Sequence, residues 1–193
     1  MNKALIIIDA QEDFTRGALR NEYAIAALPV IHEIERFAEE NEFKQIIFTH
    51  DVHYDNYLQT QEGFNLPIKH CLVGTPGCDL CPEVKPSDVI TRHPYRVTHI
   101  GKSTFGFDNW RSLWNGLSEV DSIWLCGFCT DICVSSNYHG LKSVYPETPI
   151  TVISDACAGV TPELHEAALK VMKSCHARIV TWSELKQEQK QGE

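Results

Sequence analysis

Three cysteines fall within the short stretch SIWLCGFCTDICVSSN, where an apolar run gives way to small and polar residues. Cys126, Cys129 and Cys133 could be metal ligands, a redox pair or core residues, or one of them could be a nucleophile. The apolar run predicts a buried strand, and the residues after it predict a helix capped by Thr130 or Asp131. Cys133 then falls in the first helical turn, where free backbone N–H groups and the helix dipole favour a thiolate. This position favours Cys133 as a nucleophile, whereas Cys126 is expected to fill the core.

Two Cys-x-x-Cys pairs, Cys78/Cys81 and Cys126/Cys129, offer a different chemistry. A zinc ribbon would use both pairs, and a thioredoxin-like redox site would use one. The pairs are too far apart in the sequence for a usual zinc knuckle, and Cys126 is expected within a strand end. A non-catalytic zinc-binding or redox module therefore stays as the alternative from another functional class.

A second group of candidate metal ligands follows the predicted strand 45–49. Asp51 and His53 are two residues apart, so in an extended segment their side chains point the same way. His70 comes later, with Glu62 before it. Two imidazoles and one or two carboxylates suit Zn²⁺, Mn²⁺ or Fe²⁺ and leave positions open for water. The group predicts one divalent metal ion, with Zn²⁺ as the first expectation.

These residues need a scaffold that brings them together, and the apolar pattern supplies one. Six short apolar runs predict strands buried on both faces; they lie at 4–8, 45–49, 88–91, 122–125, 150–154 and 177–181. Helical patterns lie between several runs; one would start at Pro29, and another would have Thr161 as its N-cap with Pro162 next. Strands alternating with helices predict a three-layer, Rossmann-like α/β fold with a mainly parallel six-stranded sheet.

Polar residues and cysteines stand at the carboxyl ends of the predicted strands. They are Asp9, His50 with Asp51 and His53, the three cysteines, and Asp155. In open parallel sheets, ligands bind beyond the carboxyl ends of the strands. We therefore expect these groups to share one edge of the sheet, although they are far apart in the sequence.

Length and composition limit the class of protein. The 193 residues, 43% of them apolar and 22% charged, fit one domain over residues 1–193. The net charge of −9 disfavours a nucleic-acid partner. No apolar run approaches the ~20 residues of a membrane span, and the N-terminal run is too short for a signal peptide. A cytoplasmic location with reduced cysteines is expected. Residues 52–86 are expected to form the metal-site and active-site loop, and residues 186–193 a frayed polar tail.

Taken together, the motifs resemble those of the isochorismatase-like cysteine hydrolases, and within them the nicotinamidase/pyrazinamidase branch. The resemblance extends over nearly the whole chain and rests on IIIDAQEDF, DVH with HCLVGTPG, GKSTFGF and GFCTDICV. It implies the isochorismatase-like fold, and it implies Asp9, Lys102 and Cys133 as the catalytic residues. Isochorismatases themselves lack the cysteine nucleophile, so Cys133 disfavours that activity.

The resemblance also implies a metal site and a reaction. Asp51, His53 and His70 match the metal ligands, and Glu62 matches a further ligand of some members in its spacing. The metal of this branch is thought to hold the pyridine nitrogen of the substrate or to supply the second nucleophile. The implied reaction converts nicotinamide to nicotinate and ammonia in NAD salvage. No G-x-G-x-x-G follows the first strand, so NAD itself is not an expected cofactor.

In the implied mechanism, Asp9 takes the thiol proton, Lys102 stabilises the resulting anions, and Cys133 forms a thioester. The backbone N–H groups of Cys129 and Cys133 are implied as the oxyanion hole, with a cis peptide bond between Phe128 and Cys129.

Phe14 and Phe105 are candidate substrate contacts. Two departures leave the exact amide open. Val52 stands where many members have an aromatic residue, and Phe105 and Phe107 follow the lysine closely where many members have a longer, more acidic segment. The alternative within the enzymes is a related amidase acting on another small amide or carbamoyl compound. Family members are often oligomeric, so a homo-oligomer is a further expectation.

Overall fold

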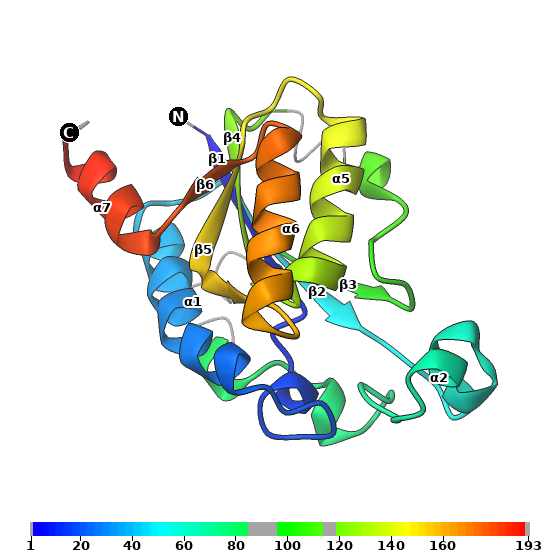
Figure 1. Ribbon diagram of the computed structural model, residues 1–193. Coiled ribbons are helices and arrows are strands. Elements are labelled where there is room, and N and C mark those ends of the chain that lie inside the picture. Colours follow the sequence, from blue (N-terminus) through cyan, green and yellow to red (C-terminus); the bar gives the residue numbers. More distant parts are fainter. Residues whose placement is uncertain (1, 85–95, 114–118, 192–193) are drawn as a thin grey trace.

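One parallel sheet organises the computed structural model, which describes residues 2–84, 96–113 and 119–191 (Figure 1). The strand order is β3-β2-β1-β4-β5-β6, and every neighbouring pair is parallel. The strands are β1 Lys3–Ile8, β2 Gln45–Asp51, β3 Val97–Lys102, β4 Ser122–Phe128, β5 Ile150–Ala158 and β6 Arg178–Val180. The predicted α/β class and six-stranded parallel sheet are confirmed.

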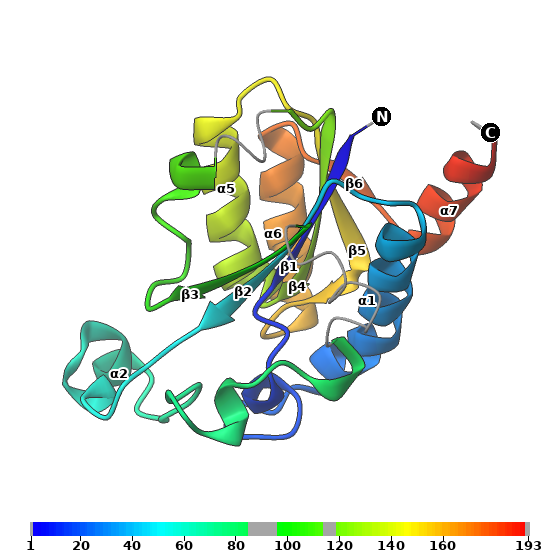
Figure 2. The same cartoon turned by 180° about the vertical axis from the view of Figure 1, so that it is seen from behind.

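Helices cover both faces of this sheet. They are α1 Glu22–Glu40, α2 Gln61–Asn65, α5 Ser135–Val144, α6 Pro162–Ser174 and α7 Trp182–Gln191. The two views from opposite sides show α5 and α6 together on one face and α1 with α7 on the other (Figures 1 and 2). The chain after β2, which includes α2, projects away from the end of the sheet. No helix among the described residues is long and apolar enough to cross a bilayer.

The central strand β1 shows why the apolar runs were informative. Residues 4–8 are completely buried, because β1 lies between β2 and β4 and has helices on both sides. Burying one isoleucine side chain contributes about 1.5–3 kcal/mol, so this strand anchors the core. Asp9 follows directly and is thereby fixed at the middle of the carboxyl edge.

The third strand differs from the prediction. The run 88–91 lies outside the described residues, and the strand that pairs with β2 is β3. This strand lies at the edge of the sheet and is only partly buried, so its sequence VTHIGK lacks a continuous apolar run. Its last residue is Lys102, which pairs in register with Asp51.

Two helix starts were predicted, and one was wrong. Thr161 caps α6 as predicted, because its hydroxyl accepts from the backbone N–H of Leu164. In contrast, Pro29 lies inside α1, which begins after Asn21. The Asn21 side chain caps the helix by accepting from two backbone N–H groups, so the helix starts about two turns earlier than Pro29 suggested.

Two further expectations at the β5 side are corrected. Asp155 lies within β5 rather than after it, and its carboxylate accepts from the backbone N–H of Trp182. It therefore serves the start of α7 instead of joining the other polar groups. Residues 186–191 of the expected frayed tail belong to α7. Residues 192–193 lie outside the described part.

Candidate active site

Asp9 occupies a special backbone position at the end of β1. Its φ is +47°, in the left-handed region that aspartate tolerates better than most residues. Its backbone N–H lies 3.2 Å from both the carbonyl oxygen and the hydroxyl oxygen of Thr49 on β2. The Thr49 hydroxyl in turn donates to Asp9 Oδ1 at 2.6 Å. The carboxylate is thus held from the neighbouring strand.

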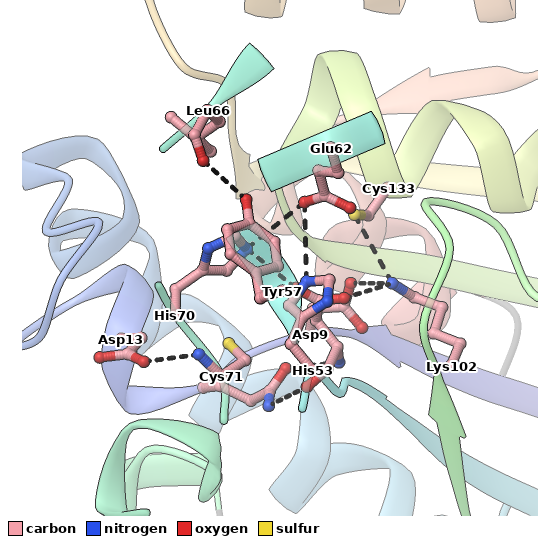
Figure 3. Close-up of polar contacts among 12 residues, drawn as sticks. Asp9, Asp13, His53, Tyr57, Glu62, Leu66, His70, Cys71, Lys102 and Cys133 are labelled. Atoms are coloured by element: carbon pink, nitrogen blue, oxygen red, sulfur yellow. Dashed lines mark hydrogen bonds and ion pairs between the residues drawn. The ribbon is translucent and has the colours of Figure 1, made fainter. Parts of the chain in front are cut away.

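Asp9, Lys102 and Cys133 meet in a buried group, although they come from the ends of β1 and β3 and from the turn after β4 (Figure 3). Lys102 Nζ lies 2.6 Å from Asp9 Oδ2 and donates to Cys133 Sγ at 3.6 Å. The sheet order explains why the three residues meet. β1, which ends next to Asp9, has β4 on one side, and β4 leads to Cys133. On its other side lie β2 and then β3, which ends at Lys102. A carboxylate, an ammonium group and a thiol in contact can move a proton from sulfur to oxygen while the charge stays balanced.

The segment that carries Cys133 has an unexpected local structure. Thr130–Val134 form a π-helical turn ahead of α5, and its N-cap is Cys129, with no side-chain cap bond. The predicted caps are therefore wrong: Thr130 hydrogen-bonds to His165, and Asp131 accepts from the N–H of Val160. Each polar side chain ties the turn to α6 or to the loop before it, in place of a cap.

The chain approaches this turn through two backbone features. The peptide bond between Phe128 and Cys129 is cis, as the resemblance predicts. Gly127 has φ of +121°, and a Cβ there would lie 2.0 Å from the carbonyl oxygen of Ile8. A side chain at this position would push β4 away from β1, so glycine is required where the two strands bring Cys133 and Asp9 together.

Burial and charge act against each other in this group. Burial raises the pKa of Asp9, and the Lys102 charge partly offsets this effect. Burial also raises the pKa of the Cys133 thiol, and Asp9 raises it further while Lys102 opposes both. Burial alone would lower the pKa of Lys102, but the anions around it, Asp9 first, outweigh burial and raise it. Lys102 therefore stays charged, and the negative charge shared by Asp9 and Cys133 can reside on oxygen or on sulfur.

Beside this group lies a set of four metal-ligand candidates. Asp51, His53, Glu62 and His70 each offer one ligand atom, and these atoms all lie within 4.8 Å of one another. Asp51 Oδ2 is 3.0 Å from His53 Nε2 and 3.3 Å from His70 Nε2. Glu62 Oε1, from α2, is 3.6 Å and 3.5 Å from the same two nitrogens (Figure 3). The structure thus brings all four predicted residues together, Glu62 included.

The chemistry of this donor set fits a divalent cation. Two imidazole nitrogens and two carboxylates converge, three of the four residues buried and Glu62 partly buried, a combination suited to Zn²⁺, Mn²⁺ or Fe²⁺. Burial would lower the pKa of His70, but hydrogen bonds to Asp51 and Glu62 outweigh it and raise the pKa to about 10. The two carboxylates therefore attract positive charge at the place where the nitrogens converge. Tyr57 packs its ring against both imidazoles, with centroids 4.6 Å and 5.0 Å away, and so limits their rotation.

The candidate substrate contacts and the other cysteines differ in their burial and in their distance from the site. Phe14 is buried, and its ring meets that of His70 edge-on at 6.2 Å, so it borders the metal-ligand group. Phe105 is about half exposed, and its carbonyl oxygen accepts from the Asn137 side chain. Cys126 is buried in β4, as the core interpretation predicts, and Cys81 is buried against the Thr15 hydroxyl.

Three buried polar residues around the site were not predicted from the sequence. Thr49 lies in the apolar run 45–49 and was therefore predicted only as a strand residue. Gln11 pairs its side-chain amide with the backbone of Asp51, accepting at 2.7 Å and donating at 2.9 Å. Asn137, one turn after Cys133, donates to the carbonyl oxygen of Cys133 at 2.8 Å. The available signal was weak: Gln11 and Asn137 are amides next to motif residues, and amides are costly to bury unless hydrogen-bonded.

Comparison with known proteins places nearly the whole chain in one family. The family model described as the isochorismatase domain matches residues 3–184. The nicotinamidase/pyrazinamidase of Mycobacterium tuberculosis is 29% identical over 92% of this chain and 98% of its own length. The nicotinamidase of Schizosaccharomyces pombe is 24% identical, over 92% of each chain.

Solved structures give the same picture in three dimensions. The crystal structure of a nicotinamidase from Bacillus subtilis superposes with a TM-score of 0.80 at 28% identity, covering 93% of this chain and 99% of that one. The pyrazinamidase of Pyrococcus horikoshii, in complex with zinc, has a TM-score of 0.78 at 26% identity, covering 94% and 100% of the two chains.

Proposed function

The chain belongs to the isochorismatase family, and we propose that it hydrolyses nicotinamide to nicotinate and ammonia through a thioester on Cys133. The observation that carries this proposal is the contact of two buried groups. A carboxylate, an ammonium and a thiol lie directly beside four converging metal-ligand candidates. Lys102 joins the two groups, because its Nζ is 2.6 Å from Asp9 and 3.8 Å from Asp51.

The proposed reaction starts with a proton transfer. The S–H bond of Cys133 breaks as Asp9 takes the proton, and the sulfur attacks the amide carbon. Lys102 stabilises the negative charge during this transfer, because it touches both the donor and the acceptor of the proton. The backbone N–H groups of Cys129 and Cys133 are the proposed donors to the resulting oxyanion.

The second half of the reaction reverses the direction of the proton. Asp9 returns its proton to the amide nitrogen, which leaves as ammonia, and a thioester remains on Cys133. Asp9 then takes a proton from a water molecule whose oxygen attacks the thioester carbon. The C–S bond breaks, this proton returns to the sulfur as the thiol, and the acid product leaves as nicotinate after losing its other proton to solvent. The nicotinate formed would return to pyridine nucleotide synthesis.

Asp51, His53, Glu62 and His70 would hold the divalent cation. Bound there, the cation would supply a Lewis-acidic position that recognises a ring nitrogen. Phe14, which borders the same group, would pack against the substrate ring. These residues would therefore select a pyridine amide over an amide without a ring nitrogen.

Ammonia release from a matched set of amides tests the proposal. Nicotinamide and pyrazinamide carry a ring nitrogen, benzamide has the same shape without it, and a small carbamoyl compound lacks the ring. We expect turnover of the first two, little turnover of benzamide, loss of activity with a chelator and recovery with Zn²⁺ or Mn²⁺. Preference for the carbamoyl compound would instead assign the chain to a related amidase. The absence of turnover with every amide would contradict the proposed function.

A further inference from the structure

Thr49 is a buried residue near the reacting atoms that the reaction proposed above does not use. It is completely buried on β2, opposite Ile8 in the register with β1. Its hydroxyl oxygen lies 2.6 Å from Asp9 Oδ1 and 3.2 Å from the Asp9 backbone nitrogen. A threonine that served only to fill the strand would not need its hydroxyl directed at a carboxylate.

The direction of the short hydrogen bond follows from the partners. An ionised carboxylate has no proton to give, so the Thr49 hydroxyl donates to Oδ1. The backbone N–H of Asp9 already points at the hydroxyl oxygen as a donor. Both contacts together fix the hydroxyl proton on the side of Oδ1, and they fix the rotation of the Asp9 carboxylate.

The two oxygens of Asp9 consequently have different surroundings. Oδ1 accepts the Thr49 hydroxyl. Oδ2 lies 2.6 Å from Lys102 Nζ, which itself donates to Cys133 Sγ, and Figure 3 shows Lys102 linked to both Asp9 and Cys133. A proton placed on Oδ1 would remove negative charge from the oxygen that accepts the Thr49 hydroxyl and so weaken this hydrogen bond. A proton placed on Oδ2 stays beside Lys102 and Cys133 and leaves the bond between Oδ1 and the Thr49 hydroxyl intact.

We propose that Thr49 is a positioning residue that assigns the two oxygens of Asp9 to different tasks, with Oδ1 held by the hydroxyl and Oδ2 exchanging the proton with Cys133. In the first step the S–H bond of Cys133 breaks and an O–H bond forms at Oδ2, while the sulfur electron pair attacks the amide carbon. In the second step the O–H bond at Oδ2 breaks and the proton leaves with ammonia. This inference rests on the proposed amide hydrolysis.

Three substitutions separate the hydroxyl from the methyl group of Thr49. Thr49→Val keeps the shape without the hydroxyl, Thr49→Ala removes both groups, and Thr49→Ser keeps only the hydroxyl. Partners that orient a functional group typically change activity 10- to 100-fold, so we expect kcat to fall by roughly that factor in Thr49→Val and Thr49→Ala. Thr49→Ser should recover most of the rate. KM and metal content should stay unchanged in all three, because the hydroxyl faces Asp9 and not the metal-ligand group.

If Thr49 had only a packing role, the rates of the Val and Ser variants would fall in the opposite order. If Thr49 only fills the strand, Thr49→Val would keep the rate and Thr49→Ser would be the impaired variant. The Ser and Ala pair preserves the test if Thr49→Val does not fold. Thr151, another buried strand threonine, lies on β5, two strands away from β1, and Thr151→Val is the matched control with an unchanged rate expected.

Alkylation of Cys133 by iodoacetamide, located by peptide mass spectrometry, supplies a readout that needs no amide substrate. We expect slower alkylation of Cys133 in Thr49→Ala than in Thr49→Ser at the same pH. This difference would support the role of the hydroxyl even if nicotinamide proved not to be the substrate. Equal alkylation rates in the two variants, or a wild-type kcat in Thr49→Val, would overturn the inference.

Discussion

Replacing Lys102 by methionine removes one buried charge and keeps most of the side-chain volume. Lys102 Nζ lies 3.6 Å from Cys133 Sγ. For two unit charges at this separation, an effective dielectric constant of about 20 gives an attraction of roughly 4–5 kcal/mol. At about 1.4 kcal/mol per tenfold change, Lys102→Met should lower kcat by roughly 10³-fold.

The same substitution should also affect stability, and the assay must separate the two effects. Asp9 would be left buried without its cation, and breaking a buried ion pair costs about 3–5 kcal/mol. Unfolding in urea gives the folded fraction, and ammonia release at saturating nicotinamide gives kcat per folded molecule. Lys186→Met is the control, because Lys186 forms an exposed ion pair with Glu33.

The control should keep the full rate. A folded Lys102→Met protein with kcat within tenfold of the wild type would refute the reasoning, because the ammonium would then contribute little to the anionic state. Lys102→Arg is a useful further variant: it keeps the charge but not the shape, so an intermediate rate is expected.

Four more outcomes are expected. Cys133→Ala should fold normally and release no ammonia; measurable turnover by the folded variant would exclude Cys133 as the nucleophile. His53→Ala should lose bound metal, measured by elemental analysis, yet keep a Cys133 that iodoacetamide alkylates. Gln11→Ala removes both side-chain bonds to the Asp51 backbone, so metal affinity should fall roughly 10- to 100-fold in equilibrium dialysis. Burial raises the pKa of Glu35 from 4.5 in the unfolded chain to about 8 in the folded protein. Between these two pH values Glu35 is ionised in the unfolded chain but still protonated in the folded protein, so the free energy of unfolding falls as the pH rises. Glu35→Gln should remove this loss, which amounts to roughly 4 kcal/mol by pH 8 in urea unfolding; parallel pH curves for the two proteins would contradict it.

Much of the architecture was predictable because local sequence patterns decide local structure. The runs of β1, β2, β4 and β5 consist mainly of apolar residues, as expected of strands that are buried on both faces. The end of such a run marks the carboxyl edge of the sheet, so Asp9 and Cys133 could be placed there. The Thr161 cap of α6 was equally local, since it depends on residues within one turn.

The edge strand and the caps of the Cys133 turn were not predictable in this way. β3 mixes buried, partly buried and exposed residues, so its sequence carries no clear strand signal, and Lys102 was predicted as a site residue only through a resemblance. The side chain of Thr130 could cap a helix, but the structure uses it to reach His165 on α6. The hydrogen-bond partner of Thr130 depends on which helix packs beside the turn, and that helix comes from a distant part of the sequence.

By itself, the sequence therefore determined which segments become strands and helices and which reactive side chains stand at their ends. Only the tertiary structure decided which of those ends become neighbours. The parallel pairing of β2 with β3 places Lys102 beside Asp51, and the pairing of β1 with β2 aims the Thr49 hydroxyl at Asp9. The physical reason is range: propensity and periodicity act over a few residues, whereas strand order and register are set by contacts between segments far apart in the chain.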